Sequence, residues 1–183
     1  MTASVQAFNI LQDVAVNARR TAKGLPAQMD IKPHWSGIGF VLFGRRFVAP
    51  IGEVAEMLEV PHYTRMPGVQ GWIRGLANVR GRLLPMIDLA AFLGGRLDAP
   101  RRNRRVLVVE SMDNYSGLLV EGVLGMQHFP VDSYVPEMVD IQHEAMVPFL
   151  QGSFREDNGR DWVVFSPSLL VRSEQFFQAA LAS

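Results

Sequence analysis

Residues 72–89 read Trp-Ile-Arg-Gly-Leu-Ala-Asn-Val-Arg-Gly-Arg-Leu-Leu-Pro-Met-Ile-Asp-Leu, and this pattern predicts a strand, a tight turn and a second strand. The turn falls at Arg80 and Gly81, where glycine can adopt the positive φ that a narrow hairpin needs. Pro85 has no backbone N–H to donate, so we expect the second strand to lie at a sheet edge or to carry a bulge.

Polar side chains are displayed at the predicted turn. Asn78, Arg80 and Arg82 alternate with apolar residues, and the amide of Asn78 is expected to stabilise the turn. A rigid hairpin that holds a guanidinium group in solvent suits recognition of a partner protein better than catalysis. Asp88, at the end of the second strand, is well placed to cap a short helix over residues 89–93.

Composition bounds the possible functions. The 183 residues are enough for one domain, or for one domain with two lobes. The formal net charge is zero, so the whole molecule does not attract nucleic acid or anionic lipid. Sixteen arginines against two lysines fit an interaction surface, or a compositional bias without functional meaning.

The absent cysteines exclude disulfides, zinc–thiolate sites and thiol nucleophiles. Neither a signal peptide nor a run of about 18 apolar residues is evident, so we expect a cytoplasmic protein that reaches a membrane only through a partner.

Short strands with frequent turn signals dominate the remaining chain, which indicates an all-β domain whose sheets close on themselves. A helix is predicted at each end, an amphipathic one over residues 5–22 and a last one that starts at Ser166. Two roles are open for the first helix: it covers an apolar face of the body, or it recruits another protein. Further strands are predicted at 37–50 (a hairpin), 54–60, 104–110, 116–126 and 161–165.

Several of these motifs together resemble the CheW family, the small adaptors that couple chemoreceptors to a histidine kinase. The run Asn78-Val79-Arg80-Gly81, followed by an apolar strand with a proline and then Asp88-Leu89, matches the signature of that family. Val54-Ala55-Glu56-Met57 is similar to its Val-x-Glu-Ile segment. Residues 117–123 are similar to its Gly-Leu-Leu-Val-Asp-x-Val strand, with Glu121 where the family usually has aspartate.

The resemblance covers residues 36–172 and implies two five-stranded SH3-like β-barrels packed side by side. On this basis residues 1–35 are an added helix and linker, and residues 173–183 are the end of the C-terminal helix. Details at residues 35–40 and 125–132, and the extra N-terminal segment, are most similar to family members of twitching-motility systems, which control type IV pili.

The resemblance also implies two partners and a contact for each. Arg80, with Asn78 and Trp72, would contact the cytoplasmic tip of a methyl-accepting chemoreceptor, and Trp72 would line a groove beside Arg80. A core position is the alternative for Trp72. Gly81 and Asp88 are assigned structural roles in the turn and the helix cap.

The second implied partner is the regulatory domain of a CheA-type histidine kinase, contacted by Val54, Glu56 and Met57. Glu56 is expected to be exposed on its strand, where it either meets the kinase or is simply solvated. Val54 and Met57 either supply apolar contact surface or belong to the core. No cofactor, metal or catalytic residue is implied.

Two rival functions start from other residues. A small hydrolase would need the carboxylates of Asp88 and Glu121 to converge in one pocket, although the first is better explained as a helix cap. A nucleic-acid-binding barrel would use Arg101–Arg105, which otherwise forms a solvated loop that shields a strand edge. The histidines share no metal-ligand spacing; they are His34, His62, His128 and His143.

Overall fold

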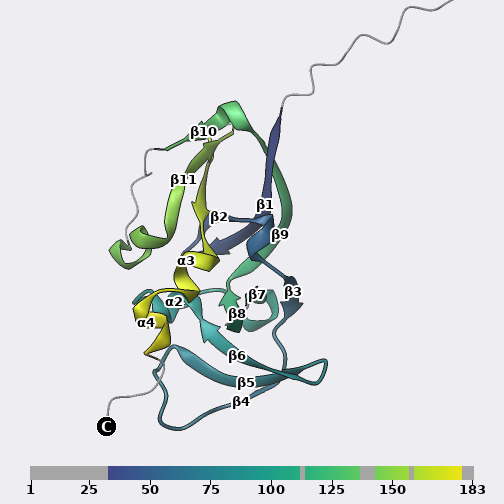
Figure 1. Ribbon diagram of the computed structural model, residues 1–183, viewed down its shortest axis with the longest axis vertical. Helices are drawn as coiled ribbons and strands as arrows, with labels where there is room; N and C mark the ends of the chain where they lie inside the picture. Colours follow the sequence, from purple (N-terminus) through teal and green to yellow (C-terminus); the bar gives the residue numbers. More distant parts are fainter. Residues whose placement is uncertain (1–32, 112–113, 137–142, 157–158, 179–183) are drawn as a thin grey trace, which may run out of the picture. The chain divides into compact units, whose positions relative to one another are not determined.

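The computed structural model describes residues 33–111, 114–136, 143–156 and 159–178 (Figure 1). The helix predicted over residues 5–22 and its linker up to residue 32 therefore lie outside the described residues.

Six strands form a first sheet, in the spatial order β10-β11-β12-β2-β1-β9. Neighbours run antiparallel except β12 and β2, which are parallel. The strands are β1 (His34–Leu42), β2 (Arg45–Pro50), β9 (Gly122–Pro130), β10 (Tyr134–Val135), β11 (Leu150–Arg155) and β12 (Asp161–Phe165).

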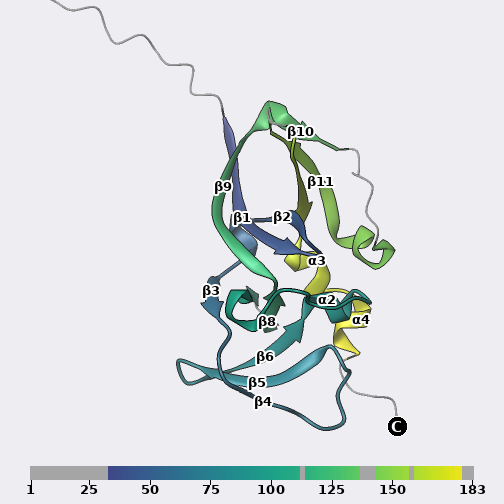
Figure 2. The same cartoon turned by 180° about the vertical axis from the view of Figure 1, so that it is seen from behind.

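Six more strands form a second sheet, in the order β3-β7-β8-β6-β5-β4, with one parallel pair, β6 and β8. Figure 2 shows this sheet from behind, below the first one. The strands are β3 (Glu56–Glu59), β4 (Tyr63–Thr64), β5 (Ile73–Val79), β6 (Arg82–Asp88), β7 (Arg105–Ser111) and β8 (Asn114–Val120).

Both sheets curl in the same way. In each, the two outermost strands follow one another in the chain: β9 and β10 are separated by residues 131–133, and β3 and β4 by residues 60–62. Three connecting residues span at most roughly 14 Å, so the opposite edges of each sheet must approach one another. The prediction of an all-β chain with two barrels is confirmed. Each sheet has six strands instead of the expected five, because a two-residue strand, β10 or β4, is added at one edge.

The helices of the described residues are short. The α-helices are α2 (Leu89–Phe92), α3 (Pro167–Val171) and α4 (Glu174–Phe177), and the 3-10 helices are η1 (Ile51–Glu53), η2 (Arg101–Asn103), η3 (Val131–Ser133) and η4 (Glu144–Phe149). The C-terminal helix predicted from Ser166 does begin there, with the Ser166 hydroxyl accepting from the backbone N–H of Leu169. It is interrupted at Arg172 and Ser173, so that α3 and α4 are separate helices.

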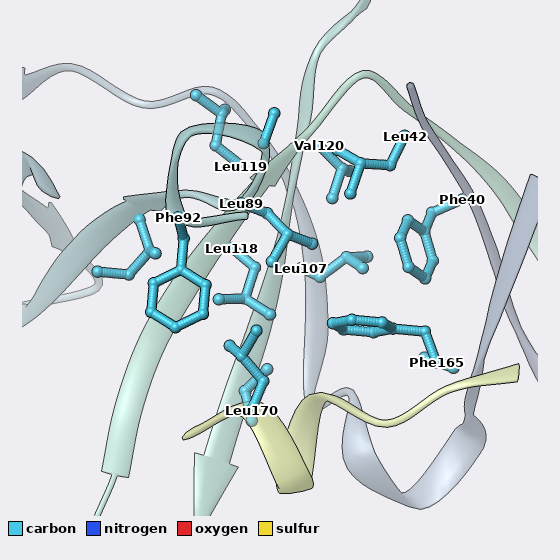
Figure 3. Packing of buried hydrophobic residues seen from close by; sticks show 14 of the residues in the cluster. Phe40, Leu42, Leu89, Phe92, Leu107, Leu118, Leu119, Val120, Phe165 and Leu170 are labelled. Atoms are coloured by element: carbon cyan, nitrogen blue, oxygen red, sulfur yellow. The ribbon is translucent and has the colours of Figure 1, made fainter. Parts of the chain in front are cut away.

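One large apolar core joins the two sheets to α2 and α3 (Figure 3). Phe40 and Phe165 contribute from the first sheet, and Leu107 and Leu118 from the second; each is less than 1% exposed. A smaller core within the first sheet is formed by Val48, Phe129, Phe154, Trp162 and Val164. Because both sheets bury side chains in the shared core, burial of apolar surface holds the two barrels together.

Two sequence predictions are corrected by the sheet topology. Residues 116–126 do not form one strand: the chain leaves the second sheet at Val120 and enters the first at Gly122. The apolar pattern hides this crossing, because apolar residues continue across it, from buried Val120 to the partly buried Val123 and the exposed Leu124.

β6 is an inner strand rather than an edge strand, and the irregularity in its pairing with β5 falls opposite Met86 and Ile87, between Ile73 and Gly75 of β5. Its parallel pairing with β8 begins at Met86, after the missing donor of Pro85.

Candidate functional site

The β5–β6 hairpin ends in a two-residue turn of the type that suits the twist of a hairpin. Val79 pairs with Arg82, and the two residues between them both have positive φ, 53° for Arg80 and 81° for Gly81. The side-chain oxygen of Asn78 accepts a hydrogen bond from the backbone N–H of Gly81, at 2.9 Å. The predicted structural roles of Asn78 and Gly81 in the turn agree with this geometry.

Arg80 occupies a conformation that is unfavourable for a residue with a side chain. The left-handed region costs an L-residue about 1–2 kcal/mol relative to the right-handed one. Its side chain is nevertheless 77% exposed, so core packing does not account for the choice of arginine. Strain of this kind at an exposed position is typical of functional sites.

The equivalent turn of the first sheet has the same backbone conformation, but its first central residue packs against the protein instead of facing solvent. Phe43 and Gly44 connect β1 and β2 with φ of 52° and 68°. The Phe43 ring stacks on His143 at a centroid distance of 3.7 Å and packs against the main core. This turn is locked against the body, whereas the turn of the second sheet presents its arginine to solvent.

Arg80 is joined to the strand that the sequence assigns to the kinase. Its Nη2 donates to Oε1 of Glu56 on β3, at 2.5 Å. The Glu56 side chain is 30% exposed, less than expected from the sequence, because it faces the hairpin turn. The residues predicted for two different partners therefore meet in one ion pair.

A second arginine of the hairpin is held more tightly. Nη1 of Arg82 donates to Glu110 at 2.8 Å, and its guanidinium carbon lies 3.8 Å from the centroid of the Tyr115 ring. The ion pair joins β6 to β7, and the cation–π contact joins β6 to β8, both at the tip of the hairpin. A cavity of about 170 Å³ lies beside the two ion pairs, lined by Ala55, Glu56, Val79, Arg80, Arg82, Val108, Glu110 and Tyr115.

The other residues assigned to the kinase differ in exposure. Met57 points outward from β3 and is 43% exposed. Val54 is partly buried and packs against the main core. Of the two, Met57 leaves apolar surface exposed and Val54 packs within the fold.

Trp72 lies at the other end of the hairpin from Arg80. It precedes β5, and its ring packs edge-on against Phe92 of α2 at 5.1 Å and stacks with Phe176 of α4 at 6.0 Å. The seven residues of β5 separate it from the turn. Trp72 therefore does not line a groove beside Arg80; it packs against the main core, which was the alternative expectation.

The two carboxylates of the rival hydrolase are buried and fully engaged in the fold. Asp88 accepts from the backbone N–H of Ala91 at 3.0 Å, as a helix cap, and from Nε of Arg74 at 2.9 Å. Glu121 accepts from the backbone N–H groups of Gly44 and Asp98. They share no hydrogen-bond partner among the described residues, and each carboxylate accepts bonds that support a turn, a loop or a helix end.

No group of three or more histidine, aspartate or glutamate side chains within the described ranges could hold a metal ion. None of the helices in the same ranges is long and apolar enough to span a membrane.

Sequence reasoning missed the partners that complete the site. Arg82 is recognisable as a turn residue, but nothing in the spacing of Glu110 and Tyr115 links them to it, since they lie on β7 and β8. The pairing of Arg80 with Glu56 was likewise not predicted, because it depends on how the second sheet curls.

Comparison with known proteins matches the chain to one family. The model of the CheW-like domain matches residues 36–175. The chain is 49% identical over 174 residues to protein PilI of Pseudomonas aeruginosa, covering 95% of this chain and 96% of that protein. It is 26% identical over 113 residues to the chemotaxis protein CheW of Helicobacter pylori, covering 62% and 68% of the two chains.

A solved structure shares the fold. The scaffolding protein TtCheW from Thermoanaerobacter tengcongensis superposes with a TM-score of 0.66, at 21% identity, over 78% of this chain and 96% of that one.

Proposed function

The chain belongs to the family of CheW-like domains, and from this premise we propose that it holds the tip of a methyl-accepting chemoreceptor and the regulatory domain of a CheA-type histidine kinase together. It is a CheW-like adaptor of a chemosensory system. Its high identity with PilI supports a role in the control of type IV pili and twitching motility. The receptor would bring the adaptor, and the kinase with it, to the inner face of the membrane.

The observation that carries the proposal is the strained, exposed Arg80 and its ion pair with Glu56. A guanidinium group in this position can form bidentate bonds to a carboxylate on a receptor helix. Leu83, which pairs with Asn78 across the hairpin, is 64% exposed and adds an apolar contact beside the turn. An apolar anchor next to a polar one fits the side of an amphipathic helix.

The kinase contact is proposed at β3. This strand lies at an edge of the second sheet, so one row of its backbone groups is not used within the sheet. Met57 adds exposed apolar surface there, and Glu56 lies on the same strand. A receptor carboxylate that competes for Arg80 would release Glu56, so one ion pair links the two proposed contacts.

The test is co-precipitation with separate fragments of the receptor tip and of the kinase regulatory domain. Arg80→Asp replaces the attractive charge by a repulsive one at an exposed position, so we expect receptor retention to fall at least about tenfold. Arg96→Asp is the matched control, because the Arg96 side chain is 88% exposed and lies outside the hairpin.

The outcomes separate the assignments. Loss of receptor binding with Arg80→Asp but not with Arg96→Asp supports the receptor contact at the turn. Unchanged receptor binding by Arg80→Asp would show that this residue is not the contact. For the kinase, Met57→Asp should lower retention of the regulatory domain while circular dichroism remains unchanged, and full retention would remove β3 from the proposal.

A further inference from the structure

Four arginines of one short segment converge on a groove of about 490 Å³. We name it the arginine groove; its lining is Glu59, Val60, Arg101, Arg102, Arg104 and Arg105. The segment carries the 3-10 helix η2 and leads into β7, while Glu59 ends β3. The groove is separate from the hairpin turn and from the ion pair between Arg80 and Glu56.

The arginines are held in place by the backbone of their own loop. Arg104 donates from Nε to the carbonyl of Ala99 at 2.8 Å and from Nη2 to the carbonyl of Leu97 at 3.0 Å. Arg105 donates from Nη1 to the carbonyls of Arg102 and Arg104. These bonds orient the two guanidinium groups before any partner arrives, which lowers the entropy cost of binding.

The positive charge of the groove is largely uncompensated. Among the described residues, no carboxylate forms an ion pair with Arg101, Arg102 or Arg104. Glu59 approaches Arg105 only to 4.0 Å and its side chain is 89% exposed. Four guanidinium groups thus face one loosely held carboxylate, although the chain as a whole has no net charge.

We propose that the arginine groove binds an acidic segment of a partner protein, through carboxylates that pair with the arginines. The planar fork of arginine matches a carboxylate in two parallel hydrogen bonds, and a concave site admits side chains that project from a peptide. Val60, in the lining, gives the groove an apolar side.

Nucleic acid fits this groove less well. Single strands need a basic track across several nucleotides with aromatic rings for the bases. Here the arginines lie within five consecutive positions, and the nearby ring of Tyr63 is covered by Arg101.

The experiment measures fluorescence anisotropy of a labelled decaglutamate peptide with the full-length protein at low salt. Arg101→Ala/Arg102→Ala removes two exposed side chains without disturbing the carbonyl bonds made by Arg104 and Arg105. We expect affinity to fall about tenfold in this variant and to fall as salt is raised, since exposed ion pairs are screened. Arg96→Ala, outside the groove, should bind as the unchanged protein does.

Each outcome bears on the proposal. A selective loss in the double variant supports it. Absence of peptide binding by the unchanged protein, equal affinity in the double variant, or an equal loss with Arg96→Ala overturns it. Tighter binding of a ten-nucleotide single strand, or of vesicles with phosphatidylserine, in parallel assays would also overturn it, in favour of a different class of partner.

Discussion

At the scale of single residues, Arg80 shows how a strained backbone can be explained by the side chain that it carries. Asparagine, aspartate or glycine is preferred at the first central position of this type of turn. The chain instead has an arginine there, and the side chain is 77% exposed. Its exposed ion pair with Glu56 is worth about 0.2–1 kcal/mol, which does not exceed the backbone cost of about 1–2 kcal/mol. Stability alone would therefore select another residue.

Arg80→Asn is accordingly expected to keep or raise the free energy of unfolding, by up to about 1 kcal/mol, because asparagine tolerates the left-handed conformation. The same change removes the guanidinium group and should lower receptor retention, by less than Arg80→Asp does because asparagine adds no repulsive charge. Urea unfolding and co-precipitation of the receptor fragment measure the two effects on one protein. A clear loss of stability would show that arginine is present for the fold and would remove the argument from strain.

Gly81→Ala provides the comparison for that experiment. A Cβ atom at Gly81 meets no atom within 4 Å, so its effect comes from the backbone, with φ at +81°, and not from a clash. The free energy of unfolding should fall by about 1–2 kcal/mol. The two changes at adjacent residues thus move stability in different directions for the same physical reason.

At the scale of elements, the crossing between the sheets depends on one buried carboxylate. Glu121 stands between β8 and β9, and its backbone N–H donates to Val41 of β1 at 3.1 Å. Its side chain accepts from Gly44, in the β1–β2 turn, and from Asp98, in the loop after α2. One side chain therefore ties a turn of the first barrel to a loop of the second.

Glu121 is 7% exposed, and replacing it by alanine removes the acceptor of those two backbone N–H groups. We expect the free energy of unfolding to fall by about 2–4 kcal/mol, from the loss of two hydrogen bonds to a buried charged group. The urea midpoint measures this effect, and Glu59→Ala, at a side chain that is 89% exposed, should change it by less than about 0.5 kcal/mol. Equal midpoints for the two variants would contradict the assigned role.

The sequence predicted an element correctly where neighbouring residues alone determine it. The turn at Arg80 and Gly81, the cap at Asp88 and the start of α3 at Ser166 each depend on neighbours in sequence, and each is confirmed. The crossing at Glu121 was missed because it depends on two segments far away in the chain. For Trp72 the alternatives of groove and core stayed open for the same reason, since the partners that settle its position lie on α2 and α4.

At the scale of the whole molecule, the two sheets share one strand pattern without a sequence repeat. In each, a hairpin with a two-residue turn is joined in parallel to a second antiparallel pair, as β1-β2 is to β12-β11 and β5-β6 is to β8-β7. The sequence predicted two barrels through the family resemblance, not through periodicity. Their packing follows from the shared core, which leaves the outer surfaces of both barrels for partners.

An adaptor with one contact for each of two partners should assemble them best at an intermediate concentration. Below it, partners lack an adaptor; above it, each partner is occupied by a separate adaptor and the bridge is lost by mass action. The amount of kinase fragment retained on receptor-coated beads should therefore rise and then fall as the concentration of the adaptor is raised to about tenfold over that of both partners. With Arg80→Asp, which retains only the kinase contact, no maximum should appear. If kinase retention by the unchanged protein instead stays constant when the adaptor is in excess, a simple bridge is contradicted. Such a plateau requires adaptors to bind one another while both partners remain attached.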